Sequence, residues 1–367
     1  MRFTVSKSAL SKALTIVSKG MASSSNQPIL SGVYLLAEEG TLEFQTTDGT
    51  ISIRHRCQAN IEEPGECVIS GKLLQNIVKN FPDAPVTFEA EGNGCYITCE
   101  ASRFLLNTLE PELFPGFPEF QVKKSLSLPR EVLSAMVDKV YRVTSKDTSR
   151  PILSGILLTA EDNVLRLVAT DSYRLAVCDT NTETSDLEGS FEIIVNGNVL
   201  HDVLSLPNDT DSILINTTDS QVIFTFGNTC YVSRKIEGRY PDYKKLLPKD
   251  CSCSVKVSLP ELEGALRRVS AITQQNPAVK FSIDVDGQVM KLSATSGDLG
   301  TASETLDVEA EGESVDVALN YRYVNDCIAA ESGEKDINFE LQGPMKPTVF
   351  KAYSTINYLY MLMPVRM

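Results

Sequence analysis

Apolar residues along this chain follow two spacings, one typical of helices and one typical of strands. Within residues 7–20, Leu10, Leu14 and Val17 are spaced by four and three residues, which places them on one face of a helix. Other stretches, such as GCYITCEAS from Gly94, alternate apolar and polar residues as a half-buried strand does. The pattern predicts a mixture of helices and strands.

The segment after the first predicted helix occurs again further along the chain. It reads QPILSGVYLLAEEGTLEFQTTDG from Gln27 and RPILSGILLTAEDNVLRLVATDS from Arg150, an offset of 123 residues (150 minus 27) without a gap. A fainter third copy begins at Asn276, where Met290 and Leu292 fall at the apolar positions of the first two copies. A repeat of this size indicates a domain with its own core.

The flanking segments repeat as well. An amphipathic stretch precedes each copy, and a second one follows it, beginning SGKLL, NGNVL and LNYRY. Each repeat of about 120 residues therefore reads strand, helix, several strands, helix, several strands. Proline-rich segments at residues 110–120 and 240–250 predict linkers. We expect three α+β domains over residues 1–122, 123–248 and 249–367.

Composition narrows the class of protein. Hydrophobic residues make up 42% of the chain and charged residues 22%, as in ordinary globular proteins. No run of about 18 apolar residues and no secretory signal pattern occurs, so we expect a cytoplasmic protein that does not span a membrane. The net charge of −14 argues against nucleic acid as a partner, although a local basic stripe can outweigh a global average.

No arrangement of residues points to catalysis, and we expect neither a cofactor nor a metal. Phosphate-binding glycine loops, nucleophile elbows and metalloprotease motifs are absent from the sequence, which has only the histidines His55 and His201. The nine cysteines are scattered and odd in number, so we predict buried or half-buried thiols, with Cys251 and Cys253 in one alternating strand. An enzyme with a site at a domain junction remains the alternative, and it would need an acid, base or nucleophile set.

Thr-Asp-Gly at residues 47–49 and Thr-Asp-Ser at residues 170–172 offer carboxylates between two predicted strands. Asp is common at tight turns because its side chain binds nearby backbone N–H groups. We therefore interpret Asp48 and Asp171 as turn residues and not as catalytic groups.

Two further features leave alternatives open. The predicted helices carry clustered cations, beginning with Lys7, Lys12 and Lys19, which form either a phosphate-binding stripe or ordinary solvated helix faces. The apolar end of the chain, NYLYMLMPVRM, is either a last core strand or the wall of a groove for a partner peptide. A peptide-binding scaffold unrelated to DNA would need the groove without the stripe.

Together, the three repeats, the PILSG…VATDSYRLAVC segment, EGRYPDYKKLLP and the closing MPVRM resemble the β sliding clamps of bacterial DNA polymerase III, over Met1–Met367. The resemblance implies three repeated domains of the DNA-clamp type, with helices lining a central hole and antiparallel sheets outside. It implies a head-to-tail homodimer that closes a ring around double-stranded DNA, non-specifically and topologically. It also implies a non-enzymatic accessory subunit that takes short apolar peptides from the replicative polymerase, the clamp loader and repair proteins.

The resemblance also implies three sets of site residues. The peptide-binding groove would comprise Leu153, Thr170, Tyr173, Arg174, Leu175, Pro241, Lys245, Leu246, Met345, Pro347, Met361, Met363, Pro364 and Arg366. The DNA-facing residues would be Lys12, Lys19, Lys72, Lys79, Lys139, Arg142, Arg150, Arg267 and Arg268. The dimer interface would pair Lys72, Phe104 and Leu106 with Ala271, Ile272 and Glu304 of the second copy. The chain departs from the family pattern at Ser172-Tyr173, where Gly-His is common, and at Lys245, where arginine is common.

Overall fold

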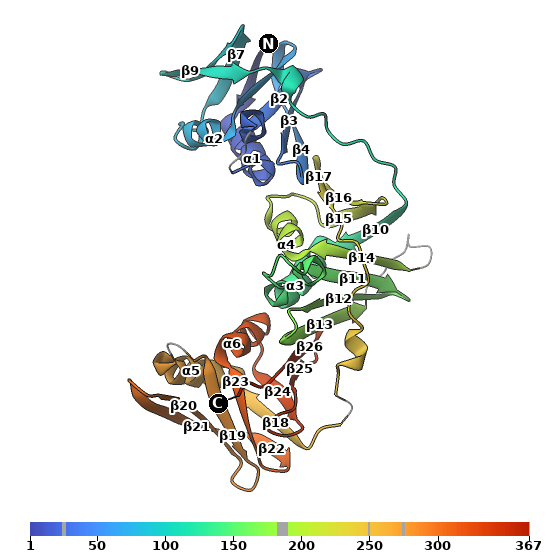
Figure 1. The fold of residues 1–367 in the computed structure, drawn as a ribbon. Coiled ribbons are helices and arrows are strands. Elements are labelled where there is room, and N and C mark those ends of the chain that lie inside the picture. Colours follow the sequence, from blue (N-terminus) through green and yellow to red (C-terminus); the bar gives the residue numbers. More distant parts are fainter. Residues whose placement is uncertain (24–26, 182–189, 249, 274–275, 367) are drawn as a thin grey trace. The chain divides into compact units, whose positions relative to one another are not determined.

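The computed structural model describes residues 1–23, 27–181, 190–248, 250–273 and 276–366 (Figure 1). The chain forms two compact units, Met1–Glu131 with Val199–Lys235 and Val132–Asn198 with Ile236–Met367. Each unit therefore combines one outer repeat with part of the central one.

The first unit is built around a thirteen-stranded sheet, in the order β10-β15-β16-β17-β4-β3-β2-β6-β9-β8-β7-β1-β5. Its strands are β1 (Arg2–Ser6), β2 (Gly32–Glu38), β3 (Thr41–Thr47), β4 (Ile51–Gln58), β5 (Asn60–Glu63), β6 (Gly65–Ser70), β7 (Pro85–Glu91), β8 (Gly94–Cys99), β9 (Ser102–Leu109), β10 (Lys124–Pro129), β15 (Ser212–Thr217), β16 (Gln221–Phe226) and β17 (Thr229–Arg234). Its helices are α1 (Lys7–Val17), α2 (Gly71–Lys79) and most of α4 (Gly197–Ser205), with short 3-10 turns at Ser18–Gly20, Pro28–Ser31 and Pro111–Leu113.

Helix α1 illustrates how the sequence sets an element. Ser6 accepts a hydrogen bond from the Ala9 backbone N–H and so satisfies one of the free donors at the helix start. The predicted face of Leu10, Leu14 and Val17 is buried against the sheet, as the 3.6-residue period requires. The helix prediction is confirmed.

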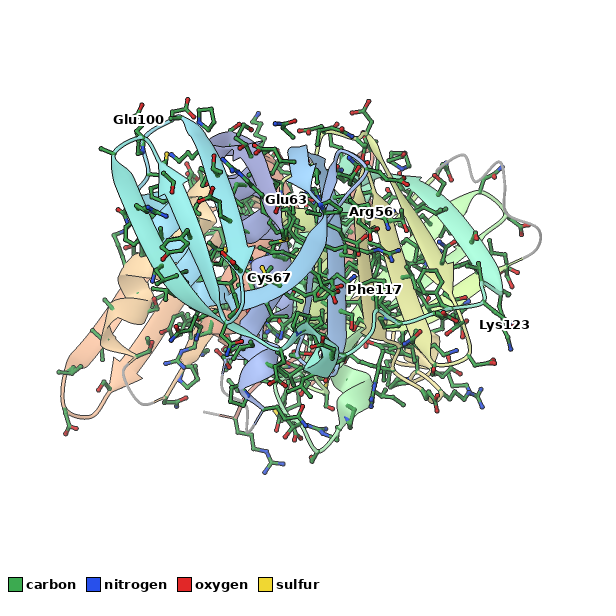
Figure 2. All side chains as sticks on the ribbon, turned by 90° about the horizontal axis from the view of Figure 1, so that it is seen from above. Arg56, Glu63, Cys67, Glu100, Phe117 and Lys123 are labelled. Carbon is green, nitrogen blue, oxygen red and sulfur yellow. The ribbon has the colours of Figure 1, made fainter. Side chains whose placement is uncertain are left out.

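The sheet of the first unit continues from the first repeat into the central one. Strand β17 pairs antiparallel with β4, and the register joins Thr229 to His55. Figure 2 looks down on this sheet, with Glu100 in the β8–β9 turn toward one side and Lys123, just before β10, toward the other. Backbone hydrogen bonds therefore tie two repeats into one unit.

The second unit contains a nine-stranded sheet, β14-β11-β12-β13-β26-β25-β24-β18-β22, and a four-stranded sheet, β21-β20-β19-β23. Its strands are β11 (Gly155–Glu161), β12 (Val164–Thr170), β13 (Arg174–Asn181), β14 (Phe191–Asn196), β18 (Cys253–Ser258), β19 (Ala278–Asp284), β20 (Val289–Ser296), β21 (Gly300–Asp307), β22 (Glu309–Gly312), β23 (Val315–Asn320), β24 (Asp336–Leu341), β25 (Thr348–Ala352) and β26 (Asn357–Leu362). Its helices are most of α3 (Arg130–Val140), α5 (Leu259–Val269) and α6 (Tyr321–Ala330), with 3-10 turns at Tyr141–Val143, Pro151–Ser154, Tyr243–Lys245 and Ser270–Ile272.

Here too a sheet joins two repeats, because β13 of the central repeat pairs with β26 at the end of the chain. The predicted order of strand, helix, strands, helix, strands is confirmed in all three repeats. Met290 and Leu292 lie buried on β20, as the third-copy alignment predicted. The linker segments 110–120 and 240–250 contain only short 3-10 turns among their described residues.

Two predictions about single residue types are also resolved. Asp48 accepts hydrogen bonds from the backbone N–H groups of Thr50 and Ile51, both at 2.7 Å, which confirms its turn role. The cysteines are free and mostly buried, but Cys251 is exposed and lies before β18 begins. The expectation of a buried or half-buried thiol in a strand is wrong at Cys251, because the strand starts two residues later.

His55 lies at the junction of β4 and β17 in the first unit, where its Nδ1 is 2.9 Å from the Thr229 hydroxyl. Burial, with a smaller contribution from Lys12, lowers the pKa of His55 to about 4. In the unfolded chain the pKa of a histidine is about 6.5. Between about pH 6.5 and pH 4 the unfolded chain therefore binds a proton that the folded chain does not bind. The free energy of unfolding must fall as the pH drops from about 6.5 toward about 4.

We expect this histidine to cost about 2–3 kcal/mol of stability between pH 7 and pH 4.5. Urea unfolding of the wild type and of His55→Gln at both pH values measures the difference. The variant should lose that much less stability on acidification than the wild type does. His201→Gln is the control, and equal acid sensitivity of wild type and His55→Gln would contradict the prediction.

Candidate functional site

The second unit has an apolar floor on one face of its nine-stranded sheet. Leu175 on β13 stands opposite Met361 on β26, and the two side chains are 0% and 5% exposed. Val349, Tyr240 and Tyr243 belong to the same buried cluster. Residues from the central repeat, the linker at residues 240–250 (hereafter the connector) and the C-terminal repeat thus share one small core.

Exposed apolar side chains accompany this floor. Tyr173 is 62% exposed, Met345 57%, Leu246 51% and Met363 40%. Tyr173 and Met363 are each two residues along the chain from Leu175 and Met361 of the floor, and exposed apolar groups of this size are typical of interaction sites. All four belong to the groove set that the sequence resemblance implies.

The end of the chain confirms the core-strand alternative as far as Leu362, while the groove wall stays a prediction. Strand β26 continues the sheet as far as Leu362, which is fully buried. The chain then leaves the sheet, and the backbone N–H of Met363 donates to the carbonyl of Tyr173 at 2.9 Å. Val365 N–H donates in the same way to Ala318 at 2.9 Å, so the last residues are held at the surface by two different repeats.

Arg174 is the most heavily bonded side chain of the site, and its side chain is only 7% exposed. It donates to Asp171 Oδ2 at 3.0 Å, Asp326 Oδ2 at 2.5 Å, Tyr360 Oη at 3.2 Å and the Arg142 carbonyl at 2.7 Å. The guanidinium also stacks over the Tyr323 ring, 4.2 Å from its centroid. Burial opposes the charge, but Tyr360 and Asp326 outweigh burial and raise the pKa of Arg174. Arg174 thus fastens the central repeat to the C-terminal one.

The Thr-Asp-Ser turn places this arginine. Asp171 Oδ1 accepts the backbone N–H groups of Tyr173 at 2.9 Å and of Arg174 at 3.1 Å, which confirms the predicted turn role. Thr170 donates its hydroxyl to the Arg174 carbonyl at 2.7 Å. Ser172 has φ 81°, in the left-handed region that favours glycine. Glycine would adopt this backbone conformation with less strain than the serine that this chain has.

The remaining groove candidates are spread along the same unit. Met345 and Arg366 line a cavity of about 440 Å³, together with Lys280 and Asp316. Lys245 is 82% exposed and pairs with Asp242 at 2.9 Å. The others are buried or half-buried: Leu153, Pro241, Pro347 and Pro364.

Most of the cations expected to face DNA are already paired within the chain. In the first unit Lys12 pairs with Asp209, and Lys19 pairs with Asp202 at 2.8 Å. In the second unit Arg150 pairs with Asp147 at 2.8 Å, and hydrogen bonds from Ser149 and Arg150 lower the pKa of Asp147 to about 2. Arg268 donates two hydrogen bonds to Glu304, from Nε to Oε1 at 2.5 Å and from Nη2 to Oε2 at 2.6 Å. The exposed remainder is Lys72, Lys79, Arg142 and Arg267.

Lys139 behaves differently from the other cations. Its side chain is 14% exposed, and its Nζ donates to Glu331 at 2.7 Å and to the Ala330 carbonyl at 2.9 Å. Burial raises the pKa of Glu331, and the contact with Lys139 offsets part of that effect. The structure therefore disfavours Lys139 as a phosphate contact. It instead joins α3 to the residue that follows α6.

Three of the residues expected at a dimer interface lie on strands with a free edge, Phe104 and Leu106 on β9 and Glu304 on β21. The other three lie on α2 (Lys72) and in the 3-10 turn Ser270–Ile272 (Ala271 and Ile272). Residues 102–107 of β9 pair only with β8, and β21 pairs only with β20, among the described strands. Phe104 on β9 is 39% exposed and packs on Phe81 with ring centroids 5.7 Å apart. Ala271 is exposed, Ile272 is half-buried, and Lys72 contacts the Ser23 carbonyl at 3.4 Å. Unpaired edges of this kind can accept a strand from another chain.

Comparison with known proteins places these features in a family. Models of the DNA polymerase III beta subunit match in order along the chain: the N-terminal domain at residues 1–118, the central domain at 127–242 and the C-terminal domain at 244–366. The chain belongs to the DNA polymerase III beta subunit family. Members of this family are sliding clamps, which are non-catalytic processivity factors of DNA polymerase III.

Relatives cover nearly the whole chain. The beta sliding clamp homolog GriR of Streptomyces muensis is 31% identical, over 89% of this chain and 87% of the relative. The crystal structure of the Bacillus subtilis DNA polymerase sliding clamp is 26% identical with a TM-score of 0.92, over 100% of this chain and 99% of that one. A Bartonella birtlesii sliding clamp bound to griselimycin is 27% identical with a TM-score of 0.92, over 100% of both chains. The clamp fold expected from the sequence is confirmed.

Sequence reasoning missed several members of the site. Asp326, Tyr323 and Tyr360 surround Arg174 from the C-terminal repeat, and no local motif marks them. Within the described residues, no group of three or more histidine, cysteine or acidic side chains could hold a metal. None of the described helices is long and apolar enough to cross a membrane.

Proposed function

We propose that this protein is a sliding clamp that closes around duplex DNA as a head-to-tail homodimer and tethers the replicative polymerase. The observation that carries the proposal is the ordered match of all three clamp domains to one chain, without a catalytic domain among them. We place the domain boundaries at residues 1–122, 123–248 and 249–367, and the protein itself in the cytoplasm, where a bacterial chromosome is replicated.

The charge pattern supports a clamp that holds DNA loosely. A clamp must attract phosphates and yet release them, because tight contacts would slow its movement along DNA. Lys12, Lys19 and Arg150 are each held by a carboxylate, and a surface ion pair of this kind is worth only about 0–1 kcal/mol. These cations can exchange a carboxylate for a phosphate at little cost. The six exposed or surface-paired residues most suited to this are Lys12, Lys19, Lys72, Lys79, Arg142 and Arg150, followed by Arg267 and Arg268.

The free strand edges support ring closure. We assign β9, with Phe104 and Leu106, and α2, with Lys72, to one side of the dimer interface. We assign Ala271, Ile272 and Glu304 of the second copy to the other side. Pairing β9 with β21 of a second copy would satisfy backbone groups that have no strand partner in the described chain.

The apolar floor and its exposed rim support peptide docking. We propose that the groove set from Leu153 to Arg366 takes short apolar peptides from the polymerase, the clamp loader and repair proteins. The griselimycin-bound clamp of Bartonella birtlesii is consistent with a ligand site in this fold. Each buried leucine or phenylalanine anchor would contribute roughly 1.5–3 kcal/mol to binding.

A topological assay tests the clamp. The protein is loaded on nicked circular plasmid by a matching clamp loader, and gel filtration then separates the DNA-bound fraction. We expect the clamp to stay on closed circles and to leave once a restriction enzyme makes the DNA linear, because nothing but the ring holds it. Equal retention on linear and circular DNA would refute the proposal.

A second arm of the assay tests the assigned interface. Light scattering should give a mass near twice 40.2 kDa for the wild type. Phe104→Asp should lower the mass toward one chain and abolish retention on circles. Leu113→Asp, at an apolar side chain 65% exposed in the same unit, is the control and should leave both unchanged.

A further inference from the structure

The groove floor continues along the sheet beyond the residues that the family resemblance assigns. On one face of β12, β13, β26 and β25, Leu175 and Met361 form one row of opposed side chains. Two residues further along each strand, Val177 stands opposite Leu359, and the next row opposes Asp179 to Asn357. Side chains two apart on a strand share a face, so these rows line one continuous surface.

A cavity of about 360 Å³ lies over the second and third rows. It is lined by Arg166, Val177, Asp179, Tyr243, Lys244, Leu247, Lys351, Tyr353, Asn357, Tyr358 and Leu359. None of these residues belongs to the groove set defined above. The apolar cluster nevertheless connects the two sites, because Val177, Leu247 and Leu359 pack with Leu175 and Met361 in it.

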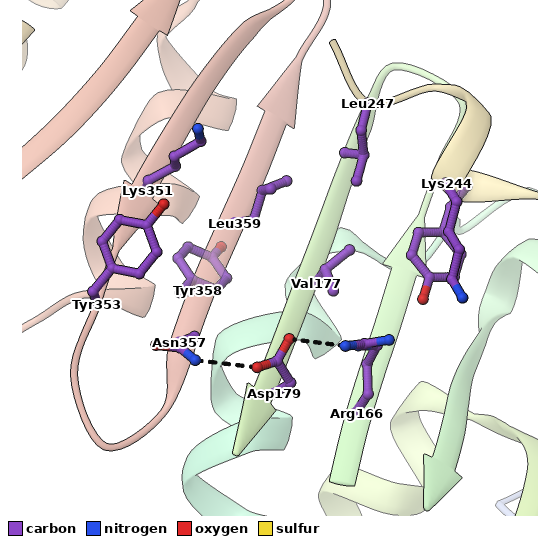
Figure 3. Close-up of a pocket in the computed structure, with 11 residues that line it drawn as sticks. Arg166, Val177, Asp179, Lys244, Leu247, Lys351, Tyr353, Asn357, Tyr358 and Leu359 are labelled. Carbon is purple, nitrogen blue, oxygen red and sulfur yellow. Dashed lines mark hydrogen bonds and ion pairs between the residues drawn. The ribbon is translucent and has the colours of Figure 1, made fainter. Parts of the chain in front are cut away.

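The cavity has a distinct chemistry. Val177, Leu247 and Leu359 border the same space from β13, the connector and β26 (Figure 3). Three cations and one anion line the cavity, although the whole chain carries a net charge of −14. The anion, Asp179, is held by Arg166 at 3.4 Å and by Asn357 at 3.2 Å.

The rim cations differ in how far they are neutralised. Lys351 is paired with Glu340 at 2.7 Å, whereas Lys244 is exposed on the connector. A local excess of positive charge over an apolar floor favours an acidic ligand that also carries a bulky apolar group. Tyr353, 74% exposed, adds an aromatic side chain at the opposite side of the opening (Figure 3).

Distance along the strands relates the cavity to the groove. Two strand residues span about 7 Å, which is also the rise of two residues in an extended peptide. We propose that this cavity is an additional subsite of the groove, which receives a bulky apolar residue with acidic neighbours, flanking the anchor of the same partner peptide. The inference rests on the proposed peptide-docking function and deepens it, because it defines a further determinant of partner choice.

Fluorescence anisotropy on the full-length protein tests the subsite. The anchor probe is a labelled short peptide that carries only a Leu-Phe anchor. It is lengthened at one end or the other by Asp-Phe-Glu, or by Ser-Gly-Ser as the matched neutral extension. We expect one Asp-Phe-Glu probe to bind about tenfold more tightly than its Ser-Gly-Ser counterpart.

Two variants locate the gain. Lys244→Glu removes the rim cation, and Leu359→Trp fills the floor of the cavity. Each should reduce the gain to less than about threefold. Lys244→Glu, on the exposed rim, should also change the affinity of the anchor probe by less than about twofold. Lys291→Glu, at an exposed lysine on β20 outside the cavity, should keep the full gain.

The outcomes separate the subsite from the groove itself. If the charged and neutral extensions bind with equal affinity while the anchor probe still binds, the subsite is refuted and the proposed clamp function is unaffected. A gain that survives both Lys244→Glu and Leu359→Trp would also overturn it, because the extension would then bind elsewhere. If the anchor probe does not bind at all, the assignment of the groove as a peptide site is refuted, and the subsite with it.

Discussion

Removal of residues 363–367 should lower the affinity for an anchored partner peptide by at least about a hundredfold. Met363 is an exposed apolar side chain beside the floor, and the backbone of Met363 and Val365 holds the segment against Tyr173 and Ala318. The truncation removes the side chain and both hydrogen bonds. Loss of contact with two peptide anchors, at roughly 1.5–3 kcal/mol each, accounts for the expected effect.

The truncated protein should otherwise be intact. Strand β26 ends at Leu362, so its pairing with β13 and β25 remains complete. Anisotropy with the Leu-Phe probe measures the loss, while light scattering and thermal unfolding should show an unchanged mass and fold. Met363→Ala should reproduce part of the effect, and Leu299→Ala, at an apolar side chain 50% exposed elsewhere in the unit, should not. Wild-type affinity after truncation would remove the end of the chain from the groove.

The internal repeat made most of the fold predictable from the sequence. Apolar positions such as Leu42 and Leu165 recur in register, and periodicity alone placed both on strands whose inward face is buried. Local spacing is sufficient here because each repeat folds by the same pattern of buried faces. The order of elements within a repeat followed directly.

The joining of repeats could not be predicted in the same way. Alternation shows which face of a strand is buried, but it does not show which strand lies at its edge. The pairings of β17 with β4 and of β13 with β26 are backbone hydrogen bonds, which leave no mark on residue type. These pairings decide that the structure divides into two compact units where the sequence shows three repeats.

Long-range polar contacts were equally hidden. Lys139 reads as a cation on a solvated helix, but it turns toward a carboxylate 192 residues away. Arg174 entered the groove set by resemblance, yet its partner Asp326 lies 152 residues further along and stands in no motif. A sequence presents charges in chain order, whereas burial and pairing depend on the neighbours that the fold supplies.

Arg174 should prove a structural residue of the second unit as well as a groove residue. Replacement by methionine would leave Asp171 and Asp326 without their shared cation next to the buried Tyr360 hydroxyl. Removing one partner from a buried ion pair costs about 3–5 kcal/mol, because the remaining charge stays desolvated. We therefore expect Arg174→Met to lower the unfolding temperature of this unit by roughly 6–20 °C.

A matched variant distinguishes burial from charge. Arg166, 33% exposed and 3.4 Å from Asp179, makes a comparable arginine–aspartate contact at the surface of the same sheet. Arg166→Met should cost no more than about 1 kcal/mol, because water screens that pair. Calorimetry of both variants gives the comparison.

A double variant tests the cause of the loss. Adding Asp326→Asn to Arg174→Met removes one of the two carboxylates that have lost their cation. The double variant should therefore regain part of the stability that the single variant lost. If instead Arg174→Met unfolds at the wild-type temperature, the buried network does not fasten the central repeat to the C-terminal one. The apolar cluster of Leu175, Val349 and Met361 would then hold the two repeats together without this network.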